Sequence, residues 1–310
     1  MKQNVSTILM IEPVAFGFNA ETAGNNYFQQ NDATAAAEIH KAAAAEFTAM
    51  RKTLEDNGVK VIVIRDTLQP HTPDSIFPNN WVSFHYDGLT ILYPMFAPNR
   101  RAERRTDILK AIENQSYLLG NKVDLSAFEA DGKFLEGTGS MILDRVNRKA
   151  YACLSERTDR DVLDVCCKIL NFKPVTFNAL QTFEGKRLPI YHTNVMMSVG
   201  DRFAVVCLQS IDDAAEREKV IAELETDGKE IIEISETQMH RFAGNMLQIE
   251  NRTGEKRIVL SQTAYESLET FQIEHLKQYG KLLPVAIPVI EKYGGGSVRC
   301  MMAEVFLPPK

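Results

Sequence analysis

The sequence lacks several features that mark particular classes of protein. It has no long run of lysine and arginine, and its formal net charge is −6, so the clustered cations that bind a nucleic-acid backbone are missing. The apolar run at residues 5–11 is too short to span a bilayer and carries no small-residue cleavage pattern. We therefore expect no nucleic acid, no membrane anchor and no signal peptide, but a cytoplasmic protein with a small-molecule ligand.

Cysteine is also scarce. The chain has 5 cysteines, an odd number, and none is arranged in the CxxC pairs typical of a metal site. A reducing compartment would leave all of them as thiols, so each serves either core packing or chemistry. No linker rich in glycine, serine or proline interrupts the 310 residues, which predicts a single catalytic domain over residues 1–310. No feature of the sequence indicates an oligomeric state.

What the chain does have is an internal repeat, a helical pattern followed by a strand-like segment. The five helix–strand pairs are 34–57 with 59–64, 101–114 with 121–128, 158–170 with 171–177, 212–226 with 228–234, and 267–279 with 280–287. The strands open at intervals of about 50 to 60 residues, a period typical of radial or stacked arrays. Short apolar segments between the pairs read as further strands, so each unit is expected to be a small ββαβ module in one α/β fold.

A polar residue in a loop marked by glycine or proline follows each repeat strand after about 15 to 21 positions. These residues are Asp74, Glu136, His192, Asn245 and Cys300. If the units surround a central axis, equivalent loops converge there and the five side chains meet in one pocket.

Cys300 and His192 form the pair that thiol catalysis needs. Cys300 follows Gly294-Gly295-Gly296, where glycine lets the backbone approach a ligand closely, and His192 stands before an apolar segment. A thiol nucleophile needs a base that later acts as an acid, which is the role we predict for His192. The structural alternatives are a core cysteine before an apolar strand and an ordinary core or surface histidine.

Glu136 and the segment around Asp74 supply further polar groups. Glu136 precedes a Gly-x-Gly turn, so we expect it to be half buried at the end of a strand. Its predicted role is to orient the His192 ring through a hydrogen bond. The alternative is an ordinary turn carboxylate. Asp74 would accept N–H bonds from a urea or guanidine, with Asn79 and Asn80 lining the same pocket. The alternative for this segment is a turn capped by its own side chains.

Several segments resemble the guanidino-group-modifying superfamily, the penteins, which includes arginine deiminases, amidinotransferases and dimethylarginine dimethylaminohydrolases. Residues 73–77 are similar to the PDSVF segment of the dimethylarginine hydrolases, residues 97–103 to their APSRRKE and residues 154–158 to their LSKRT. Residues 16–29 look closer to the arginine-deiminase-related citrulline utilization hydrolases. This segment would form a lid or part of the site wall; the alternative is an ordinary surface loop. The resemblance spans nearly the whole chain.

This resemblance implies a five-bladed α/β-propeller with pseudo-five-fold ββαβ repeats and supports the roles of Cys300, His192 and Glu136. It also makes Arg101 and Arg157 the candidates for holding a substrate α-carboxylate, since the guanidinium fork matches that group.

The chain departs from the family where carboxylates are expected. Asn79 and Asn80 replace the Glu-Asp of the dimethylarginine hydrolases, and Asn194 replaces an acid of the deiminases; Gly139 stands at a further acidic position. A desolvated guanidinium needs anionic partners, whereas an amide matches both edges of a neutral urea. We therefore predict hydrolysis of citrulline, or a close ureido amino acid, through a Cys-thiocarbamoyl intermediate to ornithine, ammonia and carbon dioxide, with no metal or organic cofactor.

Two rival functions remain from the sequence. One is an arginine deiminase, a dimethylarginine-type guanidino hydrolase or an amidinotransferase, which would prefer a guanidino amino acid. The other is a pentein binding module, because the fold also resembles ribosome anti-association factors that act by binding. A binding module has no reason to carry Cys, His and Glu in equivalent loops.

Overall fold

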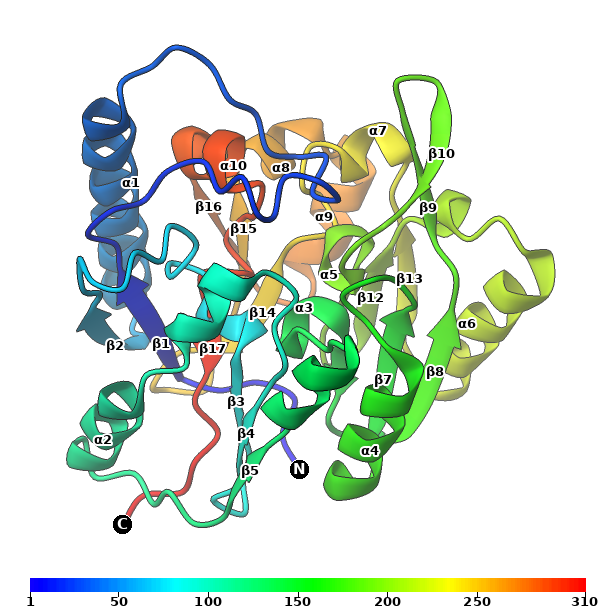
Figure 1. Ribbon diagram of the computed structural model, residues 1–310. Helices are drawn as coiled ribbons and strands as arrows, with labels where there is room; N and C mark the ends of the chain where they lie inside the picture. The colour runs from blue at the N-terminus through cyan, green and yellow to red at the C-terminus, as the bar shows by residue number, and fades with distance from the viewer.

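The computed structural model describes residues 1–310 and has a mixed α/β fold built around five three-stranded sheets (Figure 1). In each sheet the central strand pairs antiparallel with one neighbour and parallel with the other. In strand order the sheets are β17 (Ala303–Glu304), β1 (Thr7–Glu12) and β2 (Lys60–Arg65); β3 (Val82–Phe84), β4 (Thr90–Leu92) and β5 (Lys122–Asp124); β6 (Ile142–Asp144), β7 (Lys149–Cys153) and β8 (Lys173–Phe177); β11 (Met197–Val199), β12 (Phe203–Val206) and β13 (Glu230–Glu233); and β14 (Leu247–Glu250), β15 (Lys256–Ser261) and β16 (Lys281–Val285).

A helical connection joins each central strand to its parallel neighbour, which such strands require. These helices are α1 (Ala36–Asp56), α2 (Thr106–Asn114), α4 (Arg160–Leu170), α6 (Ala214–Thr226), and the pair α8 (Gln262–Ser267) and α9 (Thr270–Lys277). In α1 the side chains of Ile39, Ala43, Phe47, Met50 and Leu54 are buried, the stripe of one amphipathic helix face. The ββαβ repeat expected from the sequence is therefore present.

The two ends of the chain meet in one sheet. Near the C-terminus, β17 pairs antiparallel with β1, so that Ile8 lies opposite Glu304 and Leu9 opposite Ala303. Both termini lie at the bottom of the view in Figure 1. This pairing places residues 300–302 directly before a strand at the centre of the structure, although they are close to the end of the sequence.

Buried side chains link the sheets in chain order, with the last packed against the first. Leu9 and Phe84 share one apolar cluster, Ile91 and Leu143 another, and Tyr151 and Val205 a third. The third cluster extends to Ile258 in the fifth sheet. A fourth cluster joins Ile8 of the first sheet to Ile249 of the fifth. Long-range packing, not a linker, thus holds all five sheets together.

Some element boundaries differ from those expected. The helix expected at 101–114 begins only at Thr106, because a 3-10 helix that starts at a proline occupies Pro98–Glu103. The strand expected at 121–128 ends at Asp124, whose side chain accepts a 2.9 Å hydrogen bond from the Ser126 N–H and turns the chain into another 3-10 helix. The helix expected from residue 267 begins at Thr270. No helix is both long enough and apolar enough to cross a membrane.

Short helices fill the loops between one sheet and the next: α3 (Gly137–Ser140), α5 (Thr193–Met196), α7 (Glu236–Met239) and α10 (Pro288–Gly294). The connection between the third and fourth sheets also contains a two-stranded hairpin, β9 (Leu180–Phe183) with β10 (Lys186–Pro189), which the repeat pattern did not predict. In Figure 1 this hairpin and the long loop before α1 lie on the same side of the sheets, at the top of the view.

Candidate active site

The five polar residues marked by the repeat occupy equivalent loops. Each lies between the third strand of one sheet and the first strand of the next: Asp74 before β3, Glu136 before β6, His192 before β11, Asn245 before β14 and Cys300 before β17. All five side chains are buried. The fold thus gathers residues that are more than 200 positions apart in the sequence.

A small cavity lies where these loops meet. Its volume is about 20 Å³, room for about one water molecule. It is lined by Asn26, Asp74, Phe77, Asn80, Arg100, Arg157, Tyr191, His192, Gly294, Gly295, Gly296 and Cys300.

Glu136 and His192 form a buried pair in this site. His192 Nε2 lies 2.8 Å from Glu136 Oε2, and the other carboxylate oxygen accepts a 3.0 Å bond from the Phe96 N–H. Glu136 is fully buried and stands directly before α3, where its N–H donates to the Ser140 hydroxyl, so the expectation of a half-buried residue at a strand end was wrong. Burial alone would raise the pKa of Glu136, but the charge of Arg157 and the bond to His192 hold it below its ordinary value.

Burial dominates the titration of His192 itself. Desolvation lowers its pKa to about 4, although the Glu136 carboxylate acts in the opposite direction. At neutral pH the imidazole in this closed cavity is therefore uncharged and able to accept a proton. Glu136 fixes the ring and is placed to stabilise the imidazolium once it forms.

Two side-chain amides donate to the sulfur of Cys300. Asn194 Nδ2 lies 3.2 Å and Asn245 Nδ2 3.3 Å from the Sγ atom. Asn245 is itself fixed, because its oxygen accepts a 3.0 Å bond from the Arg299 N–H. Two N–H donors suit a sulfur that carries negative charge, the form in which a thiol is nucleophilic.

The remaining cysteines have no such surroundings. Cys153, Cys166, Cys167 and Cys207 are buried within the apolar clusters, and burial raises the pKa of each thiol. Of the two roles open to a cysteine of this chain, these four positions indicate core packing.

Several polar atoms at the site lack a hydrogen-bond partner. Asp74 Oδ1, Asn79 Oδ1, Asn80 Nδ2 and Asn194 Oδ1 are all buried and unpaired. Buried polar atoms are nearly always paired in folded proteins, so a cluster of unpaired ones indicates groups held ready for a ligand. Asn79, however, does not line the cavity; its Nδ2 lies 3.3 Å from the Thr138 hydroxyl beside it.

The loop that precedes α1 folds over the cavity. We call residues 16–30 the N-terminal loop; Figure 1 shows it crossing the top of the structure near α10. Asn19 Nδ2 donates to Asp74 Oδ2 at 2.7 Å, and Asn26 Nδ2 to the Gly294 carbonyl at 3.3 Å. Burial raises the pKa of Asp74, which Arg100 and the Asn19 bond counteract. The loop thus occupies polar groups that we had assigned to a substrate.

Two of the three arginines near this loop line the cavity. Arg157 is buried, donates to Asn25 Oδ1 and to the Thr22 carbonyl, and lies with its guanidinium carbon 4.9 Å from the centre of the Tyr191 ring. Arg100, which was not among the predicted site residues, also lines the cavity. It binds Glu103 through two bonds of 2.8 and 2.9 Å and reaches Asn80 Oδ1 at 2.9 Å.

Arg101 does not reach the cavity. Its guanidinium donates to the Met95 and Phe96 carbonyls and lies 3.4 Å from Glu129, with about a third of the side chain exposed. Arg100 and Arg101 are neighbours on one 3-10 helix, in which successive side chains point about 120° apart, so only one of them can face inward.

Glycines are required where the loops approach most closely. A Cβ at Gly139 would lie 2.4 Å from Asn80 Nδ2 and 2.9 Å from the His192 ring, and one at Gly295, whose φ is +62°, would lie 2.6 Å from Asn26 Nδ2. Any side chain at Gly139 would displace the catalytic histidine candidate.

No group of three or more His, Cys, Asp or Glu side chains is placed to hold a metal ion. Taken together, the site offers a thiol with amide donors, a neutral imidazole, a carboxylate that fixes it, and polar groups that can bind a small molecule. These are the parts of a thiol-dependent hydrolase.

Known proteins share this fold and this sequence pattern. A family model described as N,N dimethylarginine dimethylhydrolase, eukaryotic, matches residues 12–307. The chain belongs to this family, and thus to the guanidino-group-modifying pentein superfamily. The family is one of hydrolases, which favours an enzyme over the binding-module alternative. No curated protein matches the sequence.

Solved structures with the same fold include arginine dihydrolases. ArgZ, an arginine dihydrolase of the ornithine–ammonia cycle in cyanobacteria, superposes with a TM-score of 0.71 at 17% identity, over 98% of this chain and 41% of that chain. The present chain thus spans about two fifths of that protein. The N-terminal domain of ArgZ with bound substrate matches over 96% of this chain and 97% of its own, with a TM-score of 0.70 and 17% identity.

A dimethylarginine hydrolase structure is similar too. The enzyme from Pseudomonas aeruginosa, as a cysteine mutant complexed with citrulline, has a TM-score of 0.63 at 14% identity and is covered completely, with 98% of this chain aligned. At such identities the structural matches establish the fold and nothing finer.

Proposed function

We propose that this enzyme hydrolyses the ureido group of citrulline or a close ureido amino acid, with Cys300 as nucleophile, His192 as acid–base and Glu136 as the group that orients His192. The observation that carries the proposal is the set of neutral amides around the sulfur and the cavity. Asn194 and Asn245 donate to Cys300 Sγ, and Asn80 presents an unpaired Nδ2 to the cavity.

The charge of the cavity lining favours a neutral reacting group. Among the lining residues Arg100 and Arg157 are cationic, Asp74 is anionic and His192 is uncharged at neutral pH. Glu103 and Glu136 lie behind this lining and neutralise the arginines, so a single carboxylate, Asp74, is left to face a substrate. One carboxylate is a weak counter-charge for a desolvated guanidinium, whereas a ureido group needs none.

A second carboxylate cannot be fitted at the position of Gly139. A Cβ there would lie within 3 Å of both Asn80 and His192. Asn80, Asn194 and Gly139 belong to three separate loops, and none of these positions supplies a carboxylate. This agrees with a site for a neutral reacting group. Asn80 would donate to the ureido oxygen, and Asp74 would accept from a ureido N–H.

Arg157 is the group we assign to the substrate's α-carboxylate. Its guanidinium is now bonded to Asn25 Oδ1 and the Thr22 carbonyl, oxygens that a carboxylate would replace. Citrulline needs far more space than about 20 Å³, because small-molecule sites are usually about 300 to 1,000 Å³. The N-terminal loop must therefore move when the substrate binds.

The reaction then follows from the placed groups. His192, neutral in the closed site, takes the proton of Cys300, and the thiolate attacks the ureido carbon. The imidazolium, stabilised by Glu136, returns the proton to the departing δ-nitrogen, so ornithine leaves and a thiocarbamoyl group stays on the sulfur. His192 next removes a proton from water, which attacks this group; the C–S bond breaks, the thiol is restored, and the carbamate decomposes to ammonia and carbon dioxide.

The cyclic packing of the five sheets supports two further proposals. The sheets form the blades of a pentein five-bladed α/β-propeller, and residues 1–310 form a single catalytic domain. The contact of the fifth sheet with the first, through Ile249 and Ile8, is what closure of such a ring requires.

The test is the release of ammonia and ornithine from citrulline, beside arginine, agmatine and dimethylarginine, by the wild type and Cys300→Ala. We expect turnover of citrulline that is lost in the variant while its circular dichroism spectrum is unchanged. Activity that survives in Cys300→Ala would refute the nucleophile. Turnover of arginine far faster than of citrulline would remove the ureido assignment.

The family match favours one alternative, a guanidino hydrolase acting on arginine or its methylated forms. The same Cys300, His192 and Glu136 would serve it, with ammonia or an alkylamine as the leaving group. Asp74, the one charged group on the cavity wall that would bind a guanidinium, is the residue that would carry this activity.

A further inference from the structure

A second and much larger cavity lies beside the N-terminal loop. Its volume is about 420 Å³, within the range of small-molecule sites. It is lined by three residues of that loop, by the β9–β10 hairpin, by two residues after α7 and by α10 with Thr263: Tyr27, Phe28, Gln30, Gln181, Thr182, Phe183, Glu184, His240, Phe242, Thr263, Pro288, Glu291 and Lys292. None of its lining residues lines the catalytic cavity.

One wall of this cavity is aromatic. Phe28 lies 5.1 Å from Phe242 and 5.8 Å from His240, ring centre to ring centre, and Tyr27 stacks on Phe183 at 5.0 Å. Phe242 has a φ of +63°, a conformation that a bulky residue rarely adopts. Strained backbone of this kind persists mainly at ligand sites, where the position of the ring is part of the function.

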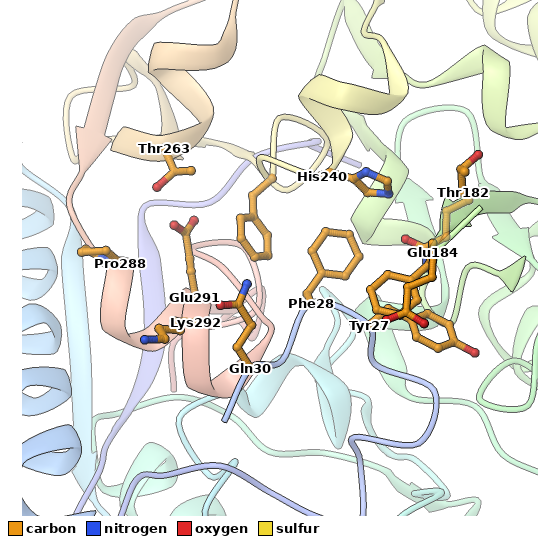
Figure 2. A pocket seen from close by; sticks show the side chains of 13 residues that line it. Tyr27, Phe28, Gln30, Thr182, Glu184, His240, Thr263, Pro288, Glu291 and Lys292 are labelled. Carbon is orange, nitrogen blue, oxygen red and sulfur yellow. The ribbon is translucent and has the colours of Figure 1, made fainter. Parts of the chain in front are cut away.

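The opposite wall carries a buried carboxylate that forms no ion pair. Figure 2 shows Glu291, with Thr263 and Pro288, on the other side of the cavity from Phe28 and His240. Glu291 is only 4% exposed, accepts a 2.7 Å bond from the Ser297 hydroxyl and forms no ion pair. Burial raises its pKa, an effect that the charge of Arg241 counteracts, but Arg241 is paired with Glu266 at 3.6 Å. The nearby Lys292 ammonium is already bound to Asp32 at 2.6 Å. A buried carboxylate without an ion-pair partner is costly, so the missing partner is expected to be a bound cation.

We propose that this cavity is a second site, which binds a small organic cation with an apolar body, such as a primary ammonium ion. Ring faces attract a cation through their quadrupole, and Glu291 supplies the counter-charge across the cavity. The 420 Å³ volume is sufficient for a ligand the size of an amino acid or an arylalkylamine.

The second site is linked to the catalytic cavity by two short connections. Tyr27 and Phe28 follow Asn26, which lines the catalytic cavity, and Glu291 binds Ser297, which follows the Gly294-Gly295-Gly296 wall of that cavity. A ligand seated against Tyr27 and Phe28 stabilises the closed position of the N-terminal loop. If the proposed function is correct, such a ligand opposes substrate binding and raises KM without changing kcat.

Binding is tested directly, without reference to activity, by calorimetric titration of the full chain with benzylamine and its neutral analogue benzyl alcohol. We expect benzylamine to bind about tenfold or more tightly than the alcohol, and Glu291→Gln to abolish that difference. Phe242→Leu, which keeps an apolar side chain but removes the ring face, should weaken benzylamine more than benzyl alcohol. Asp74→Asn, in the catalytic cavity, should leave both affinities unchanged.

Three results would overturn the site. These are no measurable benzylamine binding at millimolar concentration, equal affinity for the two compounds, or a loss in Asp74→Asn as large as that in Glu291→Gln. Thermal melts check that each variant is folded. If Glu291→Gln does not fold, Phe242→Leu still tests the site. If benzylamine binds at Glu291 but leaves the KM for citrulline unchanged, the coupling is wrong while the site stands. If citrulline is not a substrate at all, the titration is unaffected.

Discussion

Replacing Asn80 by aspartate would change the charge of the catalytic cavity with almost no change in its volume. Asn80 Oδ1 accepts a 2.9 Å bond from Arg100, and its Nδ2 has no partner. In Asn80→Asp one carboxylate oxygen keeps the Arg100 bond and the other presents an acceptor to the cavity. A guanidinium substrate would gain a charge-assisted hydrogen bond, worth about 1.5 to 3 kcal/mol. A ureido substrate would lose a donor to its oxygen.

The expected result is a shift of the ratio of kcat/KM for arginine to that for citrulline by about 10- to 150-fold towards arginine. Ornithine, citrulline and ammonia are quantified from both substrates at saturating and limiting concentrations. Asn80→Ala is the matched control, because it removes the amide without adding charge and should lower turnover of citrulline without favouring arginine. A ratio that stays within about threefold in a folded Asn80→Asp protein would show that this position does not select the charge of the reacting group.

Two further predictions concern the arginines and the histidine. Arg157→Ala should raise the KM for citrulline about tenfold or more, whereas Arg101→Ala should change it little, because Arg101 is bound outside the cavity. Steady-state kinetics measure both values, and equal effects of the two substitutions would contradict the assignment. His192 has its pKa lowered from 6.5 to about 4 in the folded state, so its contribution to stability is complete above pH 6.5, declines as the pH falls and is gone at about 4. Urea unfolding at several pH values should show a loss of about 3 kcal/mol over this window that is absent in His192→Gln.

Much of the scaffold could be predicted from local patterns. The Ile39 to Leu54 stripe of α1 and the apolar segments that follow each helix are periodicities of neighbouring residues, which one chain displays directly. The repeat also marked Glu136, His192 and Cys300, because each follows the strand of its own unit after about 15 to 21 positions. The resemblance to the family rested on short motifs, one of which contains Asp74. The match of the family model over residues 12–307 confirmed it.

The contacts between distant parts of the chain were decided by the tertiary structure alone. The pairing of β17 with β1 and the closure of the N-terminal loop over Asp74 and Arg157 join segments with no shared pattern. Which arginine faces the cavity, Arg100 or Arg101, depends on the rotation of one short 3-10 helix and not on residue type. The amino-acid sequence by itself thus determined the repeated elements and the kinds of reactive side chain, because these follow from local periodicity and chemistry. Only the packing of remote segments determined which of those side chains meet, since that depends on contacts that no local pattern records.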